Sequence, residues 1–427
     1  MNLSLMQSPV EATTRVLLLC RRSGLAPAVL AAILVALAGG RLLLRTRSGQ
    51  KPGYFRFASA FYLSLGLAAG SQGFSLLSDS LLQNLEPVKE LALGWIGLLF
   101  GLQLNWKKLE RVPPLFFRTL LFESMASMTL AGVSLWFLAK RFGWPGGQAE
   151  TLIAVALLSA LAGVSSPTAT ALAASAGGRA RPRLAHLAHF VSSLDPLLPL
   201  VLFALAAGYT HATGGGTLAA LIWLAASLLT GLIMGLLFYS FARHRHNERE
   251  LTMMIIAFAV FSGGLASCLG LSSLFTAAVT GAVLTNLVPA AERVFRALAA
   301  REKPILVLLL VLTGADWRIG EAAGPETVAC LLIVYLAARI AAKTITMALS
   351  TGKGSAGFEP GAWRGGLALL GEGGMSVAIL ANCQILFKPE LSATVVTVGL
   401  LAVICMELVS ARAARSALFT GNEPEVK

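Results

Sequence analysis

Charged residues are scarce in this sequence: Asp, Glu, Lys and Arg make up only 13% of its 427 residues, whereas 56% are hydrophobic. A soluble globular chain usually carries about 25% charged residues. The shortage excludes a water-soluble protein, whose surface must be polar, and predicts a chain whose outer face contacts lipid. Apolar windows of about 20 residues, enough to cross a hydrocarbon core of about 30 Å, recur along almost the whole sequence.

Motifs of the common enzyme classes are also missing. The five cysteines are odd in number and include no CxxC pair, which argues against a disulfide framework or a cysteine-ligated metal site. No HExxH motif, aspartate pair or Ser/His dyad is embedded at matching depth in the apolar stretches, and the GEGG run at 371–374 is too short for a phosphate-binding loop. We therefore expect neither enzyme activity nor a cofactor.

The apolar windows predict an all-α polytopic membrane protein with about 13 transmembrane helices. One window, 303–315, is short, and the connection from Cys268 to Ser272 is so tight that its two flanking spans must form a hairpin. The predicted spans are 24–44, 57–78, 87–104, 112–140, 150–174, 186–209, 216–242, 250–268, 271–288, 303–315, 326–349, 363–385 and 392–414.

Basic residues are distributed unevenly between the two sides of these spans. The loops after odd-numbered spans and the C-terminal tail, counted with the adjoining ends of the spans, hold 23 of the 34 Lys and Arg residues, and the opposite side holds 8. Cytoplasmic loops are the ones enriched in Lys and Arg, so we expect a cytoplasmic C-terminus and an N-terminus outside. The net charge of +13 is therefore a topology signal, and nucleic acid is not an expected partner.

A few charged residues lie inside the predicted spans. Each costs about 2.5–3.5 kcal/mol at a helix centre and is usually paired or functional. At about 1.5 Å per residue, Asp195 lies about 14 Å from the cytoplasmic start of its span, close to the bilayer midplane, and Glu372 has a similar depth. Arg339 is also central, and Lys343 lies one turn further on the same helix face.

Two of the spans carry helix-breaking residues. Pro167 follows Ser165 and Ser166 and precedes Thr168, and because proline removes a backbone donor, this span is predicted to be unwound there. Seven spans later, Gly371, Gly373 and Gly374 interrupt a second helix. Free carbonyls at membrane depth must be buried in protein or line a cavity. Two broken helices that run in opposite directions predict inverted repeats around a transport site.

Six segments of the chain follow one another in the order of a known family. They are IGLLFGLQLNWKKL (96–109), SSPTAT (165–170), SSLDPLLPLVLF (192–203), KPILVLLLVLTGADW (303–317), YLAARIAAK (335–343) and GLALLGEGGMSVAIL (366–380). In these segments the sequence resembles the monovalent cation:proton antiporter superfamily, of the bacterial sodium/hydrogen exchanger type.

The resemblance implies an inner-membrane homodimer in which a core domain with two crossing broken helices moves past a scaffold. The expected segments are scaffold helices at 1–110, the first half of the core at 111–209, a linker helix and scaffold helices at 210–317, the second half of the core at 318–415, and a short cytoplasmic tail at 416–427.

The resemblance also implies a mechanism. Protons and a monovalent cation, Na⁺ or K⁺, would compete for Asp195 during alternating access, and no metal other than this alkali cation is expected. The ligands expected to assist are Ser165, Ser166, Thr168 and Ser192, with Arg339, Lys343 and Glu372 as charge-compensating residues. The family usually has Asn or Asp before its ion-binding aspartate, but Leu194 stands there, so a single carboxylate remains.

Other interpretations remain open. Asp195 could serve only as a structural partner of Arg339 or Lys343, and Glu372 could either pair with these cations or line the path. Glu123 and Arg118, in the predicted span 112–140, are interpreted as structural. A carrier of another solute, such as an organic anion bound by Arg339 and Lys343, and a degenerate sensory or structural member of the fold are the alternative functions.

The charge asymmetry generates a topological prediction. A reporter fused to the C-terminus is expected to be active only in the cytoplasm, because the basic loops face that side. Activity only on the outer side would contradict this prediction and the repeat register that depends on it.

Overall fold

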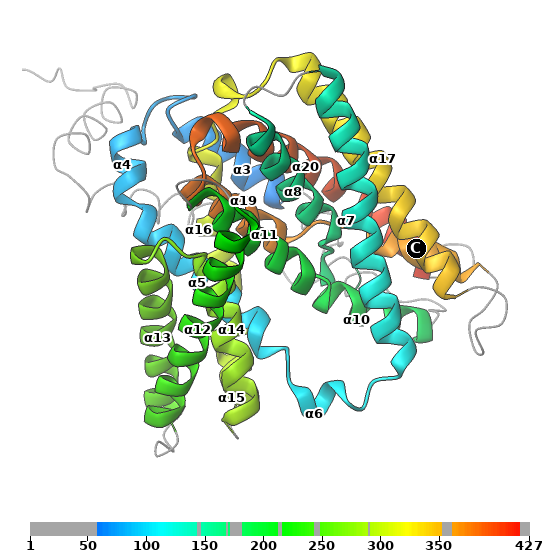
Figure 1. The fold of residues 1–427 in the computed structure, drawn as a ribbon. Coiled ribbons are helices and arrows are strands. Elements are labelled where there is room, and N and C mark those ends of the chain that lie inside the picture. Colours follow the sequence, from blue (N-terminus) through cyan, green and yellow to red (C-terminus); the bar gives the residue numbers. More distant parts are fainter. Residues whose placement is uncertain are drawn as a thin grey trace, which may run out of the picture.

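The computed structural model (Figure 1) describes residues 58–142, 147–167, 170, 182–211, 216–242, 248–288, 291–351 and 361–418. Every regular element within these ranges is a helix, which confirms the all-α prediction. The predicted span 24–44, Thr168 and residues 419–427 of the predicted tail lie outside the described residues.

Helices from the two segments predicted as scaffold pack mainly with one another. Helices α5 and α14 share the most extensive contact. Helices α13 and α16 also pack against α5, and α3 packs against α16. In Figure 1, α5, α12, α13 and α14 stand side by side. These helices are α3 (Ala58–Ala69), α4 (Asp79–Asn84), α5 (Glu86–Leu102), α6 (Trp106–Leu109), α12 (Thr217–Ala242), α13 (Glu248–Cys268), α14 (Ser273–Leu287), α15 (Ala291–Ala299) and α16 (Glu302–Ala315).

Helices from the two segments predicted as core form a second group. Here α7 lies against α8 and α17, α8 against α11, and α20 against α17, α18 and α19. Short 3₁₀ turns, η2 (Ile319–Glu321) and η3 (Ala362–Arg364), lie in the connections. The helices are α7 (Pro114–Phe142), α8 (Gln148–Gly163), α10 (Pro182–Leu194), α11 (Leu197–His211), α17 (Pro325–Ser350), α18 (Gly365–Ala368), α19 (Gly374–Leu386) and α20 (Pro389–Leu418).

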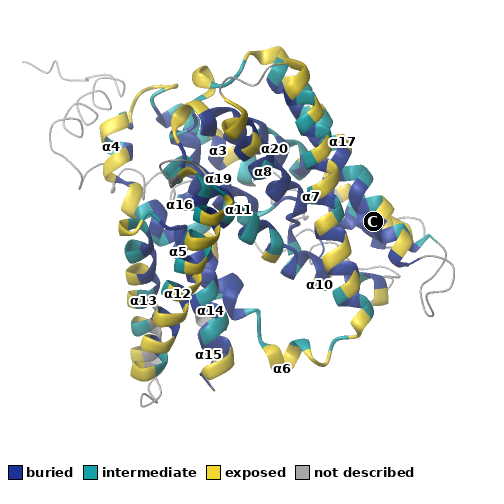
Figure 2. Cartoon of the chain, in the orientation of Figure 1, coloured by how far each residue is buried: buried dark blue, intermediate teal, exposed yellow. Residues whose placement is uncertain are grey.

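Five described helical stretches are long and apolar enough to cross a membrane by length and composition: Pro114–Phe142, Arg183–Thr210, Thr217–Phe241, Pro325–Ser350 and Pro389–Ser410. Their burial differs, since α12 is largely exposed whereas most of α20 is buried (Figure 2). The exposed side chains of α12 include Leu221, Ile222, Leu229 and Ile233. An apolar exposed face of this kind is suited to contact with lipid.

The predicted span 186–209 is interrupted by a turn. Helix α10 ends at Leu194 and α11 begins at Leu197, with Asp195 and Pro196 between them. The stretch Arg183–Thr210, which is long and apolar enough for one span, is therefore not one continuous helix. The physical reason is Pro196, which lacks the N–H that would continue the helical hydrogen bonds, although the Asp195 N–H still bonds to the Val191 carbonyl at 2.9 Å.

Two further boundaries differ from the predicted spans. The span predicted at 57–78 is helical only to Ala69 in α3, because glycines follow at 70 and 73 and Ser75 has a φ of 54°. Helix α15 occupies a predicted loop, and it buries Val294 and Leu298 while exposing Glu292. A one-sided helix this short lacks the apolar length of a span, which is why a search for apolar windows missed it.

Glycines allow α5 and α14 to approach closely. A Cβ atom on Gly101 would overlap the Ala278 carbonyl oxygen, and one on Gly281 would meet the Leu98 carbonyl oxygen. Small residues at such contacts let helix backbones pack directly in a membrane, where no hydrophobic force drives helices together.

This packing predicts the effect of Gly101→Val. The added side chain must push α14 away, so we expect a loss of about 1–3 kcal/mol of stability, measured as a lower thermal midpoint in detergent. Gly264→Val on α13 is the control, because a Cβ atom there meets nothing within 4 Å. Equal midpoints for the two variants would contradict the proposed close contact.

Candidate functional site

The two interrupted helices meet at their breaks. Helix α8 ends at Gly163, and the chain from Val164 to Ser166 is non-helical. The chain is also non-helical from Leu370 to Gly373, between α18 and α19. The Ser166 N–H donates a hydrogen bond of 2.8 Å to the Gly371 carbonyl. The two crossing broken helices predicted from the sequence are thus present.

Close approach explains the glycines in the second break. A Cβ atom on Gly373 would lie 2.6 Å from the Ser166 hydroxyl oxygen, and one on Gly374 would lie 2.7 Å from the Leu306 side chain. Gly371 contributes its carbonyl to the crossing, as described above. Gly373 therefore lets the second break lie directly against the first, and Gly374 lets it lie against α16.

Arg339 of α17 is fully buried behind the crossing. Its guanidinium donates hydrogen bonds to the carbonyls of Leu161 at 3.0 Å, Ala162 at 2.8 Å and Val164 at 2.5 Å. Longer contacts of 3.4–3.5 Å reach the carbonyls of Leu370 and Gly371. Helix C-termini carry unsatisfied carbonyls and partial negative charge, so this cation neutralises the end of α8.

Glu372 is the acidic partner of Arg339. Its Oε1 atom lies 3.4 Å from the Arg339 Nε atom and accepts a hydrogen bond of 3.0 Å from the Tyr335 hydroxyl. Glu372 could either pair with a buried cation or line the transport path, and these contacts correspond to pairing with a cation.

Asp195 lies in the turn between α10 and α11 and is buried, with an exposed fraction of 1%. Its Oδ1 atom accepts a hydrogen bond of 3.1 Å from the Ser165 N–H. Its Oδ2 atom is buried and accepts no hydrogen bond from the described residues. Among these residues no salt bridge links Asp195 to Arg339 or Lys343, whose carboxylate partners are Glu372 and Glu123.

Lys343 and Ser165 connect the site to α7. The Lys343 ammonium lies 2.5 Å from the Glu123 Oε1 atom and donates a hydrogen bond of 2.8 Å to the Ser165 hydroxyl. Ser165 therefore accepts from Lys343 through its side chain and donates to Asp195 through its backbone. The residues that the structure brings together are Asp195, Ser165, Lys343 and Glu123.

The other predicted ligands lie around this group. Ser166 is buried and its N–H bonds across the crossing. The Ser192 hydroxyl donates to the His189 carbonyl at 3.1 Å and lies 3.4 Å from the Thr170 hydroxyl. Ser192 thus joins a neighbouring polar cluster, and within the described residues no hydrogen bond links it to Asp195.

Glu123 is the member of this group whose partner the sequence does not indicate. Arg118 of the same helix is exposed, and the partner of Glu123 is Lys343. A signal was present, because Ser124 and Ser127 accompany Glu123 on α7, and the Ser127 hydroxyl donates to its Oε1 atom at 3.1 Å. A polar patch inside a membrane helix usually faces the protein interior.

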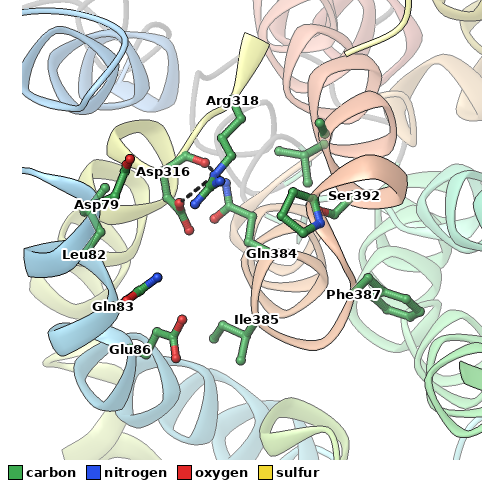
Figure 3. Close-up of a pocket in the computed structure, with 13 residues that line it drawn as sticks. Asp79, Leu82, Gln83, Glu86, Asp316, Arg318, Gln384, Ile385, Phe387 and Ser392 are labelled. Atoms are coloured by element: carbon green, nitrogen blue, oxygen red, sulfur yellow. Dashed lines mark hydrogen bonds and ion pairs between the residues drawn. The ribbon is translucent and has the colours of Figure 1, made fainter. Parts of the chain in front are cut away.

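A separate cavity of about 230 Å³ lies where α4 and α5 approach the C-terminal ends of α16 and α19 (Figure 3). Asp79, Glu86, Asp316, Arg318 and Gln384 are among its lining residues, and Asp195 is not. The cavity is therefore not the Asp195 site. Among the described residues no group of three or more His, Cys, Asp or Glu side chains is arranged to hold a metal ion.

Comparison with known proteins identifies the family. The model of the transmembrane sodium/hydrogen exchanger family matches residues 17–409. The chain belongs to this family. Its members are transporters, so the protein is a multi-pass membrane transporter of the cation:proton exchange type. No curated protein matches the chain.

A solved structure has the same fold as this exchanger. It is the sodium proton antiporter MjNhaP1 from Methanocaldococcus jannaschii at pH 8, with a TM-score of 0.65 and 16% sequence identity. The match covers 92% of this chain and 98% of that one. At this identity the likeness establishes the antiporter fold alone.

The position of Arg339 predicts a large effect of Arg339→Met. Methionine fills similar space but leaves the carbonyls of α8 and the Glu372 carboxylate without their cation. Because breaking a buried ion pair costs about 3–5 kcal/mol, we expect a clearly lower thermal midpoint in detergent. Arg412→Met, at an exposed position of α20, is the control, and the prediction is wrong if both variants unfold at the same temperature.

Proposed function

We propose that this exchanger moves a monovalent cation, Na⁺ or K⁺, against protons by alternating access, and that both ions bind in turn to Asp195. The observation that carries the proposal is the Asp195 carboxylate, which is buried beside two crossing helix breaks, forms no salt bridge among the described residues and has an Oδ2 atom without a hydrogen-bond partner there. Glu123 and Glu372 also have one such oxygen each, but both are paired with a cation. A buried carboxylate oxygen is costly unless it binds something. A proton and an alkali cation are the two ligands that an exchanger must bind alternately.

The surrounding groups suit a dehydrated alkali cation. Hydroxyl and carbonyl oxygens are hard ligands of the kind that replace the hydration shell of such ions. Ser165, Ser166, Thr168 and Ser192 are the proposed hydroxyl ligands, with Asp195 as the anionic one. Ser165 lies beside the carboxylate, because its N–H bonds to Asp195. To join the set, the Ser165 hydroxyl would have to leave Lys343, and the Ser192 hydroxyl would have to turn away from its present partners.

The charges around the site support one-for-one exchange. Lys343 and Arg339 each have their own carboxylate partner, so both would stay charged through the cycle. The site then has the same charge with a proton on Asp195 as with a monovalent cation on its carboxylate. Exchange of one proton for one cation moves no net charge.

The same pairing weighs against the alternative of an organic-anion carrier. An anionic substrate would need Arg339 or Lys343 as its ligand, and both are fully buried and already paired with glutamates. A degenerate sensory or structural member would have no use for a buried carboxylate without a counterion. Cation exchange remains the better explanation of the contacts.

The proposal includes the cellular setting expected from the sequence. The protein would lie in the inner membrane with its N-terminus outside and its C-terminus in the cytoplasm, as the distribution of basic residues suggests. It would form a homodimer through its scaffold helices, and the helices from 111–209 and 318–415 would move as the core.

Asp195→Asn is expected to abolish exchange. The substitution keeps the size of the side chain but removes its charge, so neither a transferable proton nor a cation can bind. The measurement uses liposomes with a trapped pH dye, an imposed proton gradient, and sodium, potassium or lithium added in turn. An imposed membrane potential should not drive exchange by the wild type.

Glu372→Gln is the matched control, because it also neutralises a buried acid of the same crossing, and it is expected to reduce exchange less. Full exchange by Asp195→Asn would refute the Asp195 site and favour transport of another solute. Potential-driven exchange that depends on Asp195 would refute only the one-for-one stoichiometry.

A further inference from the structure

Lys343 contacts one carboxylate directly and is linked to a second through Ser165. Its ammonium contacts Glu123 on one side and the Ser165 hydroxyl on the other. Ser165 in turn donates its N–H to Asp195. Only one residue therefore separates the Lys343 ammonium from the carboxylate at which cations are proposed to bind.

Lys343 must have an acidic partner. Its side chain is fully buried, and a buried ammonium without a counterion is strongly unfavourable. Glu372 is engaged by Arg339 and Tyr335. Glu123 and Asp195 are the remaining acids of this cluster, so the loss of Glu123 leaves Asp195 as the counterion of Lys343.

We propose that Glu123 is a positioning residue for the transport site: it holds the Lys343 ammonium as its own counterion and so prevents Lys343 from occupying Asp195 in place of the transported cation. This inference rests on the proposed function and goes further. It assigns to Glu123 of α7 the role of keeping cation movement at Asp195 coupled to proton movement.

The contacts of α7 fit this role. The Ser127 hydroxyl donates to the same Glu123 oxygen that contacts Lys343, which fixes the carboxylate toward the ammonium. The neighbouring Ser124 hydroxyl lies 3.4 Å from the Asp195 carbonyl oxygen. One turn of α7 thus contacts both the lysine and the aspartate.

Glu123 also determines the charge of the empty site. With Lys343 neutralised by Glu123, an empty Asp195 carboxylate leaves the site with a net negative charge, and crossing the membrane in that state is unfavourable. Without Glu123, the empty site holds a neutral Lys343 and Asp195 pair. This pair could cross the membrane with no ion bound, so cation movement would no longer require a proton in return.

Glu123→Gln in the intact protein tests the inference. We expect its KM for the cation to rise at least tenfold, because the cation must displace Lys343 from Asp195. We also expect its cation flux to respond to an imposed membrane potential, unlike that of the wild type. A side chain that only filled space would produce neither the response to potential nor a selective rise in KM.

Two further variants complete the experiment. Glu407→Gln makes the same chemical change at a partly buried glutamate that accepts hydrogen bonds from the Ser59 and Ala60 N–H groups, and it should leave exchange independent of potential. Glu123→Gln combined with Lys343→Met removes both members of the ion pair. If the unpaired ammonium causes the defect, this double variant should recover a lower KM and potential-independent exchange.

The outcomes separate this inference from the proposed function. A wild-type KM and no response to potential in Glu123→Gln would overturn the inference, as would a double variant that reaches the membrane but behaves no better than Glu123→Gln. If Glu123→Gln does not reach the membrane, only the double variant is measured. A raised KM or a response to potential in the double variant would then overturn the inference. Full exchange by Asp195→Asn would instead refute the Asp195 site itself.

Discussion

Where α8 ends inside the protein, its last carbonyls have no helical hydrogen-bond donors, and the Arg339 guanidinium bonds to three of them. Open backbone at this depth requires such a partner, because lipid offers none. The same guanidinium reaches the second break and lies beside Glu372. The crossing of the two helices, and with it the position of Ser165 beside Asp195, depends on this one buried cation.

Around the crossing, each buried cation has a carboxylate. Arg339 is paired with Glu372, Lys343 with Glu123 and, further away, Lys89 with Asp316 at 2.5 Å. Asp195 differs from the other acids of the crossing because no basic side chain among the described residues forms a salt bridge with it. Because Glu123 and Glu372 are already paired with cations, Asp195 is the acid of the crossing on which the proposed function rests.

Hydrogen bonds also join the two groups of helices. Asn382 of α19 donates to the Ser272 hydroxyl at 2.6 Å, and Gln384 donates to the carbonyls of Thr313 and Asp316 at 3.0 and 3.1 Å. The Trp317 indole donates to Thr397 of α20 at 3.0 Å. If one group moves past the other during transport, these hydrogen bonds have to break. Because the groups that form them are polar, they can bond to water instead.

The sequence by itself determined that the protein lies in lipid and in which order its helices follow one another, because a long apolar run in lipid has few alternatives to a helix. It also located both helix breaks, since Pro167 and the glycines at 371–374 act through local backbone chemistry. It did not show that Asp195 lies in a turn, which the neighbouring Pro196 could have indicated. The partners of the buried charges were decided only by the tertiary structure. Lys343 lies 220 residues from Glu123 in the chain, and which acid it meets depends on how α7, α8 and α17 pack together.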